Sequence, residues 1–486
     1  MKYTVKTQPQ PSASFTLIPY KSDALPEDVK EQLSSLYNIP ISVLGGKHSQ
    51  MISTPSSDGG LNSILLLPTI EKTGLQAYPS ILGELKKYEA RLQSKIQIEL
   101  SLENEDLLPA VIRACELADY STGLYQTADK KPHPFQAKGA AATVILKADH
   151  VKESRGIIKE AVVLAKHQRA TMDLVNGPGN KVTPEYFAKA AVKMGAASGF
   201  KTTVFGKSRI EKSGLHALLA VNKGSEYLPR FLILEYKPTR KKGVKSLGLV
   251  GKGVTFDTGG LSIKGSQNMH YMKSDMGGAA AVLGTIAAAA ELKWQIHLVG
   301  IIPLTDNCVD ATSIKPGDVI RSYSGKTIEV INTDAEGRLI LADGLAYLIK
   351  NFEMDHVIDL ATLTGSCVRT FGDVCAGMFS NDEELAEQLF LSGLNTGEKL
   401  WTLPLWPDYD DQMESEIADI KNLSTKPVAG AITAAKFLEF FTFDHPSWAH
   451  LDIAGVAFGD TKFSKEKSAT GFGVHLLADF IKDNMI

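Results

Sequence analysis

Two carboxylates and a guanidinium lie close together in the segment Asn332–Leu339, whose sequence is NTDAEGRL. Asp334 and Glu336 are two positions apart and Arg338 follows after another two, directly behind the β-branched run Thr327–Ile331. In an extended backbone such residues point to the same side, so their charges would crowd at the mouth of a strand. Neighbouring carboxylates repel unless a cation lies between them, and a divalent metal ion meets that need. A surface salt bridge between Glu336 and Arg338 is the simpler alternative.

A glycine-rich segment earlier in the chain supplies a lysine and another aspartate. Ser246–Val250 is short and apolar and predicts a buried strand, after which the chain continues from Gly251 as GKGVTFDTGGLSIK. The glycines around Lys252 and Asp257 indicate sharp turns or a close approach to another group. The spacing matches neither G-x-G-x-x-G nor G-x-x-x-x-G-K-[ST], so phosphate binding is weakly supported.

A further aspartate, Asp275, precedes a run of small residues. It lies in Met272–Gly278, MKSDMGG, and the run Ala279–Ala290 follows. Taken alone, Asp275 is most simply a helix N-cap, because aspartate is favoured at that position. The small residues predict a core helix that packs tightly on a sheet, and the run is too short to cross a bilayer.

Together these segments resemble the metal-site motifs of the leucine aminopeptidase (cytosol aminopeptidase) family of two-metal exopeptidases. The resemblance spans roughly the last two-thirds of the chain and continues through ATLTG (Ala361–Gly365), AGAITAAKFL (Ala429–Leu438), WAHLDIAG (Trp448–Gly455) and ATGFGV (Ala469–Val474). One position departs from the family pattern, because His270 stands where an acidic residue is usual. That position is not among the ligands that the resemblance implies, so we expect an intact metal site.

The resemblance implies a dinuclear metal centre with five ligands. Asp257 and Glu336 would bridge both ions, Asp334 would complete one site, and Asp275 with the neutral amine of Lys252 would complete the other. Four carboxylates balance the charge of two divalent ions, which matters in a cleft that holds little water. Oxygen ligands with one nitrogen suit Mn, Zn, Mg or Co, and the sequence does not choose among them.

The same resemblance assigns two cations to catalysis and six residues to the substrate. Lys264 would stabilise the oxyanion and Arg338 would hold a bicarbonate ion as general base, while a hydroxide bridging the metals attacks the peptide bond. The enzyme would remove N-terminal residues, leucine-like ones preferred, from peptide or aminoacyl substrates. The pocket for the first side chain would be formed by Met272, Thr362, Leu363, Gly365, Ala454 and Ala457.

Composition agrees with a soluble enzyme. The 486 residues are 44% apolar and 22% charged, with a formal net charge of −3 that argues against a nucleic-acid-binding surface. The four cysteines form no C-x-x-C pair, and the eleven histidines include no H-E-x-x-H. The first residues lack the basic start and apolar core of a signal peptide, so we expect a cytoplasmic protein with no membrane segment.

The order of predicted elements divides the chain into two α/β domains. Residues 1–150 mix short strands and helices without a catalytic constellation, and 151–175 predicts a long linking helix. Strands alternate with helices in 176–486, which predicts a larger catalytic domain with a central, twisted, mostly parallel sheet flanked by helices. Ligands of such sheets bind at the carboxyl ends of the strands. By resemblance alone we expect a homohexamer.

Two other functions stay open on the sequence. A two-metal phosphoesterase uses related chemistry, although the chain lacks a histidine-rich site. A DNA-binding accessory role is known among some members of the resembled family, although the acidic balance of this chain argues against it.

Overall fold

Two compact units make up the chain, and each contains its own sheet. The computed structural model describes residues 1–10, 13–21, 25–44, 48–55, 61–69, 72–102, 104–128, 132–239 and 243–486. The first unit comprises Met1–Lys166 with Asn395–Gly397, and the second comprises His167–Leu394 with Glu398–Ile486. Helix α4 (Val151–Asn176) runs through the division between the units. The expected α/β class is confirmed. The assignment of 1–150 as an N-terminal domain, 151–175 as a linking helix and 176–486 as the catalytic domain stays a prediction.

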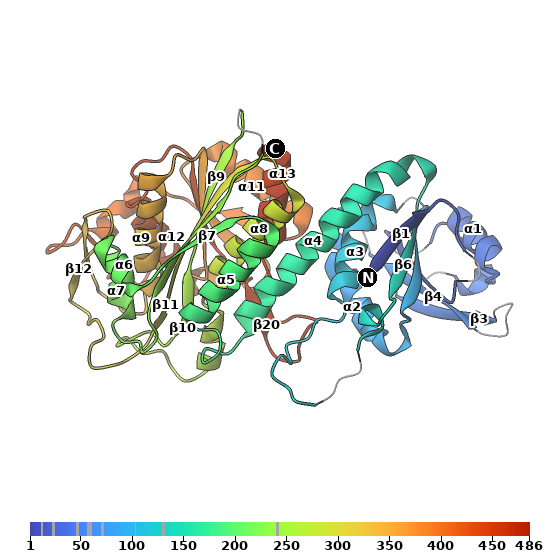
Figure 1. The fold of residues 1–486 in the computed structure, drawn as a ribbon, viewed down its shortest axis with the longest axis horizontal. Helices are drawn as coiled ribbons and strands as arrows, with labels where there is room; N and C mark the ends of the chain where they lie inside the picture. The colour runs from blue at the N-terminus through green and yellow to red at the C-terminus, as the bar shows by residue number, and fades with distance from the viewer. Residues whose placement is uncertain are drawn as a thin grey trace. The chain divides into compact units, whose positions relative to one another are not determined.

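The first unit is built on a six-stranded sheet (Figure 1). Its strand order is β1-β6-β5-β2-β4-β3, and neighbours are parallel except for β3 and β4. The central strand β2 is buried at every residue, as its unbroken apolar character requires in a covered sheet. The strands and α-helices of this unit before α4 are β1 (Lys2–Lys6), β2 (Phe15–Tyr20), α1 (Glu27–Tyr37), β3 (Gln50–Pro55), β4 (Leu61–Pro68), α2 (Tyr78–Lys87), β5 (Lys95–Glu99), α3 (Leu108–Leu117) and β6 (Ala141–Ile145).

The second unit is built on a nine-stranded sheet with a parallel centre (Figure 1). Its order is β16-β15-β18-β14-β9-β11-β8-β7, and β10 pairs with the end of β11. Strands β18, β14, β9 and β11 are parallel neighbours, whereas β8 lies antiparallel to β11 and to β7, and β15 antiparallel to β18. The strands of this sheet are β7 (Lys201–Phe205), β8 (Arg230–Tyr236), β9 (Ser246–Gly251), β10 (Gly253–Asp257), β11 (His297–Asn307), β14 (His356–Ala361), β15 (Ala376–Ser380), β16 (Leu400–Thr402) and β18 (Trp448–Asp452). Two smaller sheets are formed by β12 (Val319–Arg321), β13 (Thr327–Glu329) and β17 (Ile420–Lys421), and by β19 (Phe458–Gly459) and β20 (Ser468–Ala469).

Helices cover both faces of this sheet (Figure 1). Helices α8 and α9 both pack against β9, β11 and β14, and α8 also contacts α5 and α13 whereas α9 contacts α7 and α12. The helices that follow α4 are α5 (Pro184–Ser198), α6 (Lys207–Lys212), α7 (His216–Asn222), η7 (Met269–Ser274), α8 (Gly277–Leu292), α9 (Glu336–Asn351), α10 (Gly365–Phe371), α11 (Glu383–Thr396), η8 (Pro407–Met413), α12 (Gly430–Glu439) and α13 (Val474–Asn484).

The small residues of α8 allow its backbone to approach the sheet closely. A Cβ atom at Gly251 of β9 would lie 2.6 Å from the Cα of Ala279, so neither position has room for a larger side chain. The helical segment Met269–Leu292 is long and apolar enough to cross a membrane, but 89% of its most apolar window is buried inside the unit. Among the described residues it is the one segment that meets this test, and its burial identifies it as a core helix.

The expected extended conformation of Asn332–Leu339 is wrong. Strand β13 ends at Glu329, a turn follows, and Glu336 is already the first residue of α9. The β-branched run predicted a longer strand, but Glu336 and the residues from Arg338 onward are mostly good helix formers, which favour a helix. Residues two apart on a helix point in different directions, so the shared face predicted for Glu336 and Arg338 does not exist.

Candidate metal centre

The five residues expected to bind metal come from five segments and meet at one edge of the sheet. Lys252 follows β9, Asp257 ends β10, and Asp275 lies between η7 and α8. Asp334 lies in the turn before α9, and Glu336 begins that helix. One carboxylate oxygen from each of Asp257, Asp334 and Glu336 lies within 4.8 Å of the other two. This is the carboxyl-terminal edge of the parallel strands, where open α/β sheets bind ligands.

Burial determines the electrostatics of these carboxylates. Glu336 is 1% exposed, Asp257 3% and Asp275 8%. Burial, and then repulsion from Glu336, raises the pKa of Asp257, and burial raises the pKa of Asp275 despite the nearby Lys252. Burial and repulsion from Asp257 likewise raise the pKa of Asp334. The ionised cluster is therefore costly unless cations compensate for the lost water.

Two buried carboxylate oxygens of the cluster have neither a hydrogen bond nor an ion pair with any described residue: Oε2 of Glu336 and Oδ2 of Asp275. Buried acceptors in proteins are normally satisfied, so these atoms need another partner. Converging carboxylate oxygens without donors are a typical environment for a divalent cation. The residues present therefore fit the metal centre that the sequence predicts.

Lys252 lies inside the carboxylate cluster. Its Nζ is 2.7 Å from Asp275 Oδ1 and 3.0 Å from Glu336 Oε1, and it donates to the carbonyl oxygen of Thr362 at 2.9 Å. Burial lowers the pKa of this amine, but Asp275 and Glu336 outweigh burial and the pKa is raised. Its stem packs over Gly337, where an added Cβ would lie 2.7 Å from Nζ. Only glycine leaves this space in the first turn of α9.

Lys264 contacts the two carboxylates of the cluster that Lys252 does not contact. Its Nζ is 2.8 Å from Asp257 Oδ2 and also forms an ion pair with Asp334. Burial lowers the pKa of Lys264, but the carboxylates, Asp257 first, raise it above its ordinary value. The side chain is 23% exposed, compared with 4% for Lys252. Of the two lysines, Lys264 is therefore the one that an incoming molecule reaches.

Arg338 is buried in the first turn of α9, two residues after Glu336. It is 4% exposed, and its Nη1 donates to the carbonyl oxygen of Asn422 at 2.8 Å. Burial lowers the pKa of the guanidinium to about 10 although Glu336 and Asp452 oppose the shift, and its Nε has no hydrogen-bond partner among the described residues. The simpler alternative of a solvated salt bridge between Glu336 and Arg338 fails, because both side chains are buried.

Two asparagines that the sequence analysis did not single out hold the cluster together. Asn307 ends β11, and its Nδ2 donates to Asp257 Oδ1 at 2.9 Å and to the carbonyl oxygen of Thr333 at 3.0 Å. It therefore ties β10 to the turn that carries Asp334. Its position at the end of a strand at the ligand-binding edge was the available signal.

Asn422 binds the turn from the other side. Its Oδ1 accepts from the backbone N–H groups of Ile331 and Asn332 at 2.8 and 3.3 Å. Its Nδ2 donates to the carbonyl oxygens of Asn332 and Ala335 at 2.7 and 3.3 Å. The side chain is fully buried, and the backbone carbonyl of the same residue holds Arg338. One residue thus fixes the turn, the start of α9 and the guanidinium.

Four of the six residues expected to line the substrate pocket lie in two loops, Thr362 and Leu363 in one and Ala454 and Ala457 in the other. Thr362 Oγ1 donates to Asp275 Oδ1 at 2.7 Å, and a Cβ at Gly277 would lie 3.4 Å from the methyl group of Thr362 and 3.0 Å from that of Ala457. The backbone N–H groups of Leu363 and Ala454 both donate to Asp452 Oδ1, at 3.1 and 3.2 Å. The buried Asp452 thereby joins the two loops.

Three other residues named from the sequence lie around these loops. Met272 is part of η7, three positions before Asp275, and Gly365 is the first residue of α10. The exposed His270 also lies in η7, and its ring is 4.0 Å from that of Tyr271. No described contact joins Met272, Gly365 or His270 to the carboxylate cluster.

Sequence similarity to known proteins covers the part of the chain that carries this centre. The profile of the cytosol aminopeptidase family, catalytic domain, matches residues 169–478. The chain belongs to this family. A probable cytosol aminopeptidase of Chlorobaculum tepidum is 53% identical over 323 residues, which cover 66% of this chain and 64% of that relative. Another, of Chlorobium phaeobacteroides, is 48% identical over 356 residues, which cover 73% and 70%.

A solved structure extends the comparison of the cytosol aminopeptidase fold to almost the whole chain. The bottromycin maturation enzyme BotP in complex with Mn has a TM-score of 0.78 and 28% sequence identity. The match covers 97% of this chain and 99% of that chain. The family resemblance expected from the motifs is confirmed, and the likeness in fold includes the first unit.

Proposed function

We propose that the chain is a metal-dependent aminopeptidase that removes N-terminal residues from peptides, with leucine-like residues preferred. The observation that carries the proposal is the convergence of Asp257, Asp334 and Glu336 within 4.8 Å, with Oε2 of Glu336 lacking a donor among the described residues. Membership of the cytosol aminopeptidase family supports it, and the structural neighbour BotP is in complex with Mn.

Five residues of the cluster would hold two divalent ions. Asp257 and Glu336 would contact both ions, Asp334 would complete one site, and Asp275 with Lys252 would complete the other. Mn, Zn, Mg and Co all suit this set of oxygens with one amine. When bound, the ions supply a hydroxide at neutral pH and polarise the peptide carbonyl. Lys252 ligates only as a neutral amine, so the proton that Asp275 and Glu336 now stabilise must leave Nζ.

Lys264 and Arg338 would act on the reacting groups. The partly exposed Nζ of Lys264 would donate to the oxygen of the scissile carbonyl, where negative charge develops. Arg338 is held by the Asn422 carbonyl, and its Nε is left for an anion. That anion would be bicarbonate, which supplies a general base while Glu336 serves as a metal ligand.

The pocket beside Asp275 would select small to medium apolar side chains. Its proposed walls are apolar or small, and the methyl groups of Thr362 and Ala457 lie close to Gly277. A carboxylate on the first residue of the substrate would approach Asp275, whose pKa is already raised by burial. Leucine and methionine should therefore be accepted, and aspartate and glutamate rejected.

We also propose a location and an assembly. The names of the relatives, probable cytosol aminopeptidases, support a place in the cytoplasm, and the homohexamer is proposed from the family resemblance alone. Exposed apolar side chains on the second unit, among them Trp406 and Ile417, offer surface for contact between subunits. The mass of the particle in solution, measured by light scattering, tests the hexamer.

A panel of small substrates tests the proposed activity. Leucine amide, methionine amide and glutamate amide are compared in the presence of Mn²⁺, together with N-acetyl-leucine amide and a phosphate monoester. We expect rapid hydrolysis of the first two only, because the free α-amine is needed beside Asp275. Hydrolysis of the acetylated compound would refute exopeptidase action, and turnover of the phosphate ester alone would favour a phosphoesterase.

A further inference from the structure

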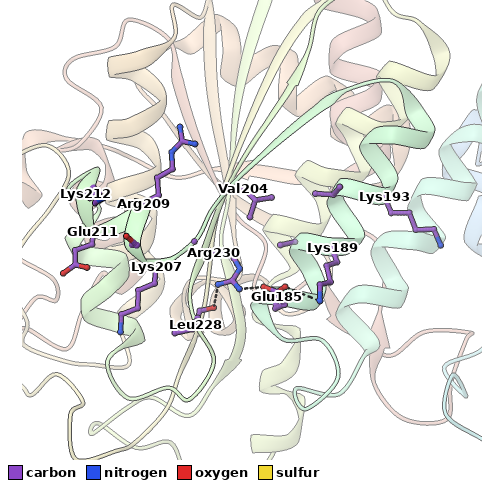
Figure 2. Close-up of a pocket in the computed structure, with 14 residues that line it drawn as sticks. Glu185, Lys189, Lys193, Val204, Lys207, Arg209, Glu211, Lys212, Leu228 and Arg230 are labelled. Carbon is purple, nitrogen blue, oxygen red and sulfur yellow. Dashed lines mark hydrogen bonds and ion pairs between the residues drawn. The ribbon is translucent and has the colours of Figure 1, made fainter.

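A large open cleft lies at the edge of the second unit's sheet, where β7 is the last strand (Figure 2). Its volume is about 1270 Å³, and its lining comes from α5, from the end of β7, from α6 and from the start of β8. None of its lining residues belongs to the metal centre. Helix α5 packs with α8, whereas α6 packs with α7, which contacts α9. The cleft therefore passes around the sheet edge from one face to the other.

The cleft is strongly positive although the whole chain is acidic. Six cationic side chains line it and only two carboxylates, Glu185 and Glu211, oppose them, whereas the whole chain has a net charge of −3. Figure 2 shows that Glu185 forms ion pairs with both Arg230 and Lys189, so one carboxylate is divided between two cations. The cations are Lys189, Lys193, Lys207, Arg209, Lys212 and Arg230.

Four of these six cations have no acidic partner. Among the described residues, Lys193, Lys207, Arg209 and Lys212 form no ion pair, and all four are exposed. In Figure 2, Lys193 and Lys207 extend on either side of Val204, which lies at the end of β7. An anionic ligand along β7 would therefore meet a positive charge on each side.

The middle of the cleft is apolar and borders an unpaired strand edge. Val192 is 47% exposed and Leu228 is 52% exposed, and both line the cleft with Val204. Strand β7 pairs with β8 on one side, and no described strand pairs with its other side. Its backbone N–H and C=O groups on that side are available to another chain.

We propose that this cleft binds an acidic peptide segment of a partner protein, which adds to β7 as an extended strand. Backbone hydrogen bonds to β7 would supply affinity, and carboxylates on the two faces of the added strand would pair with Lys193 on one side of the sheet and with Lys207 on the other. Apolar side chains between these carboxylates would cover Val192 and Leu228. A second copy of this edge is disfavoured as the occupant, because its lysines would oppose these ones.

A blocked, labelled peptide tests the proposal on the full chain. The probe is an acetylated and amidated peptide of about ten residues in which pairs of glutamates alternate with pairs of valines, so that each face of the strand carries carboxylates, and its binding is followed by fluorescence anisotropy. Its blocked N-terminus prevents its use as a substrate. We expect saturable binding that Lys193→Glu/Lys207→Glu weakens about tenfold or more, with hydrolysis of leucine amide unchanged. The matched control Lys152→Glu/Lys159→Glu makes the same change in charge at exposed positions of α4, and it should bind the probe normally.

Two further probes separate strand addition from charge attraction. A peptide of the same sequence with every second amide N-methylated keeps its charge but loses the donors of one edge, so it should bind much more weakly. Hydrogen exchange at 201–205 should slow with the unmodified peptide only. Equal binding of the methylated peptide, tighter binding of a DNA oligonucleotide of equal charge, or a change in oligomeric state with Lys193→Glu/Lys207→Glu would each overturn the proposal.

Discussion

Replacement of Asn422 by alanine should weaken metal binding without removing a ligand. The change deletes four side-chain hydrogen bonds, of which those to Ile331 N–H and Asn332 C=O are short at 2.8 and 2.7 Å. At about 1 kcal/mol for each good bond, with a further penalty for the stranded partners, the loss of stability should be about 2–4 kcal/mol. The turn that carries Asp334 and the start of α9 with Glu336 would also lose their common anchor. Supports of this kind cost about 10–100-fold in metal affinity when removed.

Urea unfolding and calorimetric titration with Mn²⁺ measure the two effects separately. Asn422→Asp keeps the volume and the acceptor but directs a carboxylate oxygen at the carbonyl groups of Asn332 and Ala335, so it should lose affinity as well. Asn351→Ala is the matched control, because Asn351 is exposed and lies away from the centre. Its side-chain amide donates hydrogen bonds to the Tyr323 hydroxyl and to the Tyr347 carbonyl oxygen. If Asn422→Ala loses stability but binds Mn²⁺ as tightly as the unmodified chain, Asn422 has only a structural role.

Two further predictions concern the lysines and a buried carboxylate. Lys252→Ala should bind one metal ion much more weakly, whereas Lys264→Ala should keep both ions and lose about 10²–10³-fold in kcat. Elemental analysis measures the bound metal in both variants, and steady-state kinetics measures kcat. A normal kcat in Lys264→Ala would refute the oxyanion role. Burial raises the pKa of Asp343 from 3.8 to about 7 despite three backbone donors. The folded state then holds this proton more tightly than the unfolded state, so stability should fall as pH rises from about 4 to about 7. Urea unfolding across this range should show a smaller fall for Asp343→Asn, and equal slopes would contradict the shifted pKa.

The sequence predicted which residues lie together at the centre better than it predicted their local backbone structure. Carboxylates that lie close together are costly to bury in any fold. They therefore indicate a nearby cation whether the segment that carries them is a strand or a helix. The structure brings Lys252, Asp257, Asp275, Asp334 and Glu336 together. The strand predicted for Asn332–Leu339 failed because the β-branched run before it ends in a turn, and α9 begins at Glu336.

The supports of the centre could not be read from local patterns. Asn422 follows the two-residue strand β17, and its side chain reaches residues 90 or more positions earlier, Ile331 and Asn332. No period or cap motif indicates such a contact, since tertiary packing alone creates it. The parallel strands of the second unit were predictable from their apolar runs, whereas the antiparallel pairing of β8 with β11 depends on the connection and not on composition.

Hydrolysis of leucine amide by metal-stripped protein shows whether the activity depends on bound metal. The protein is freed of metal with a chelator, its metal content is measured, and Mn²⁺, Zn²⁺, Mg²⁺ and Co²⁺ are returned one at a time. Because the buried Glu336 Oε2 and Asp275 Oδ2 have no partner among the described residues, we expect no turnover in the stripped protein. Activity should return when the measured metal content approaches two ions per chain. Full hydrolysis of leucine amide with no bound metal would contradict a metal-dependent mechanism.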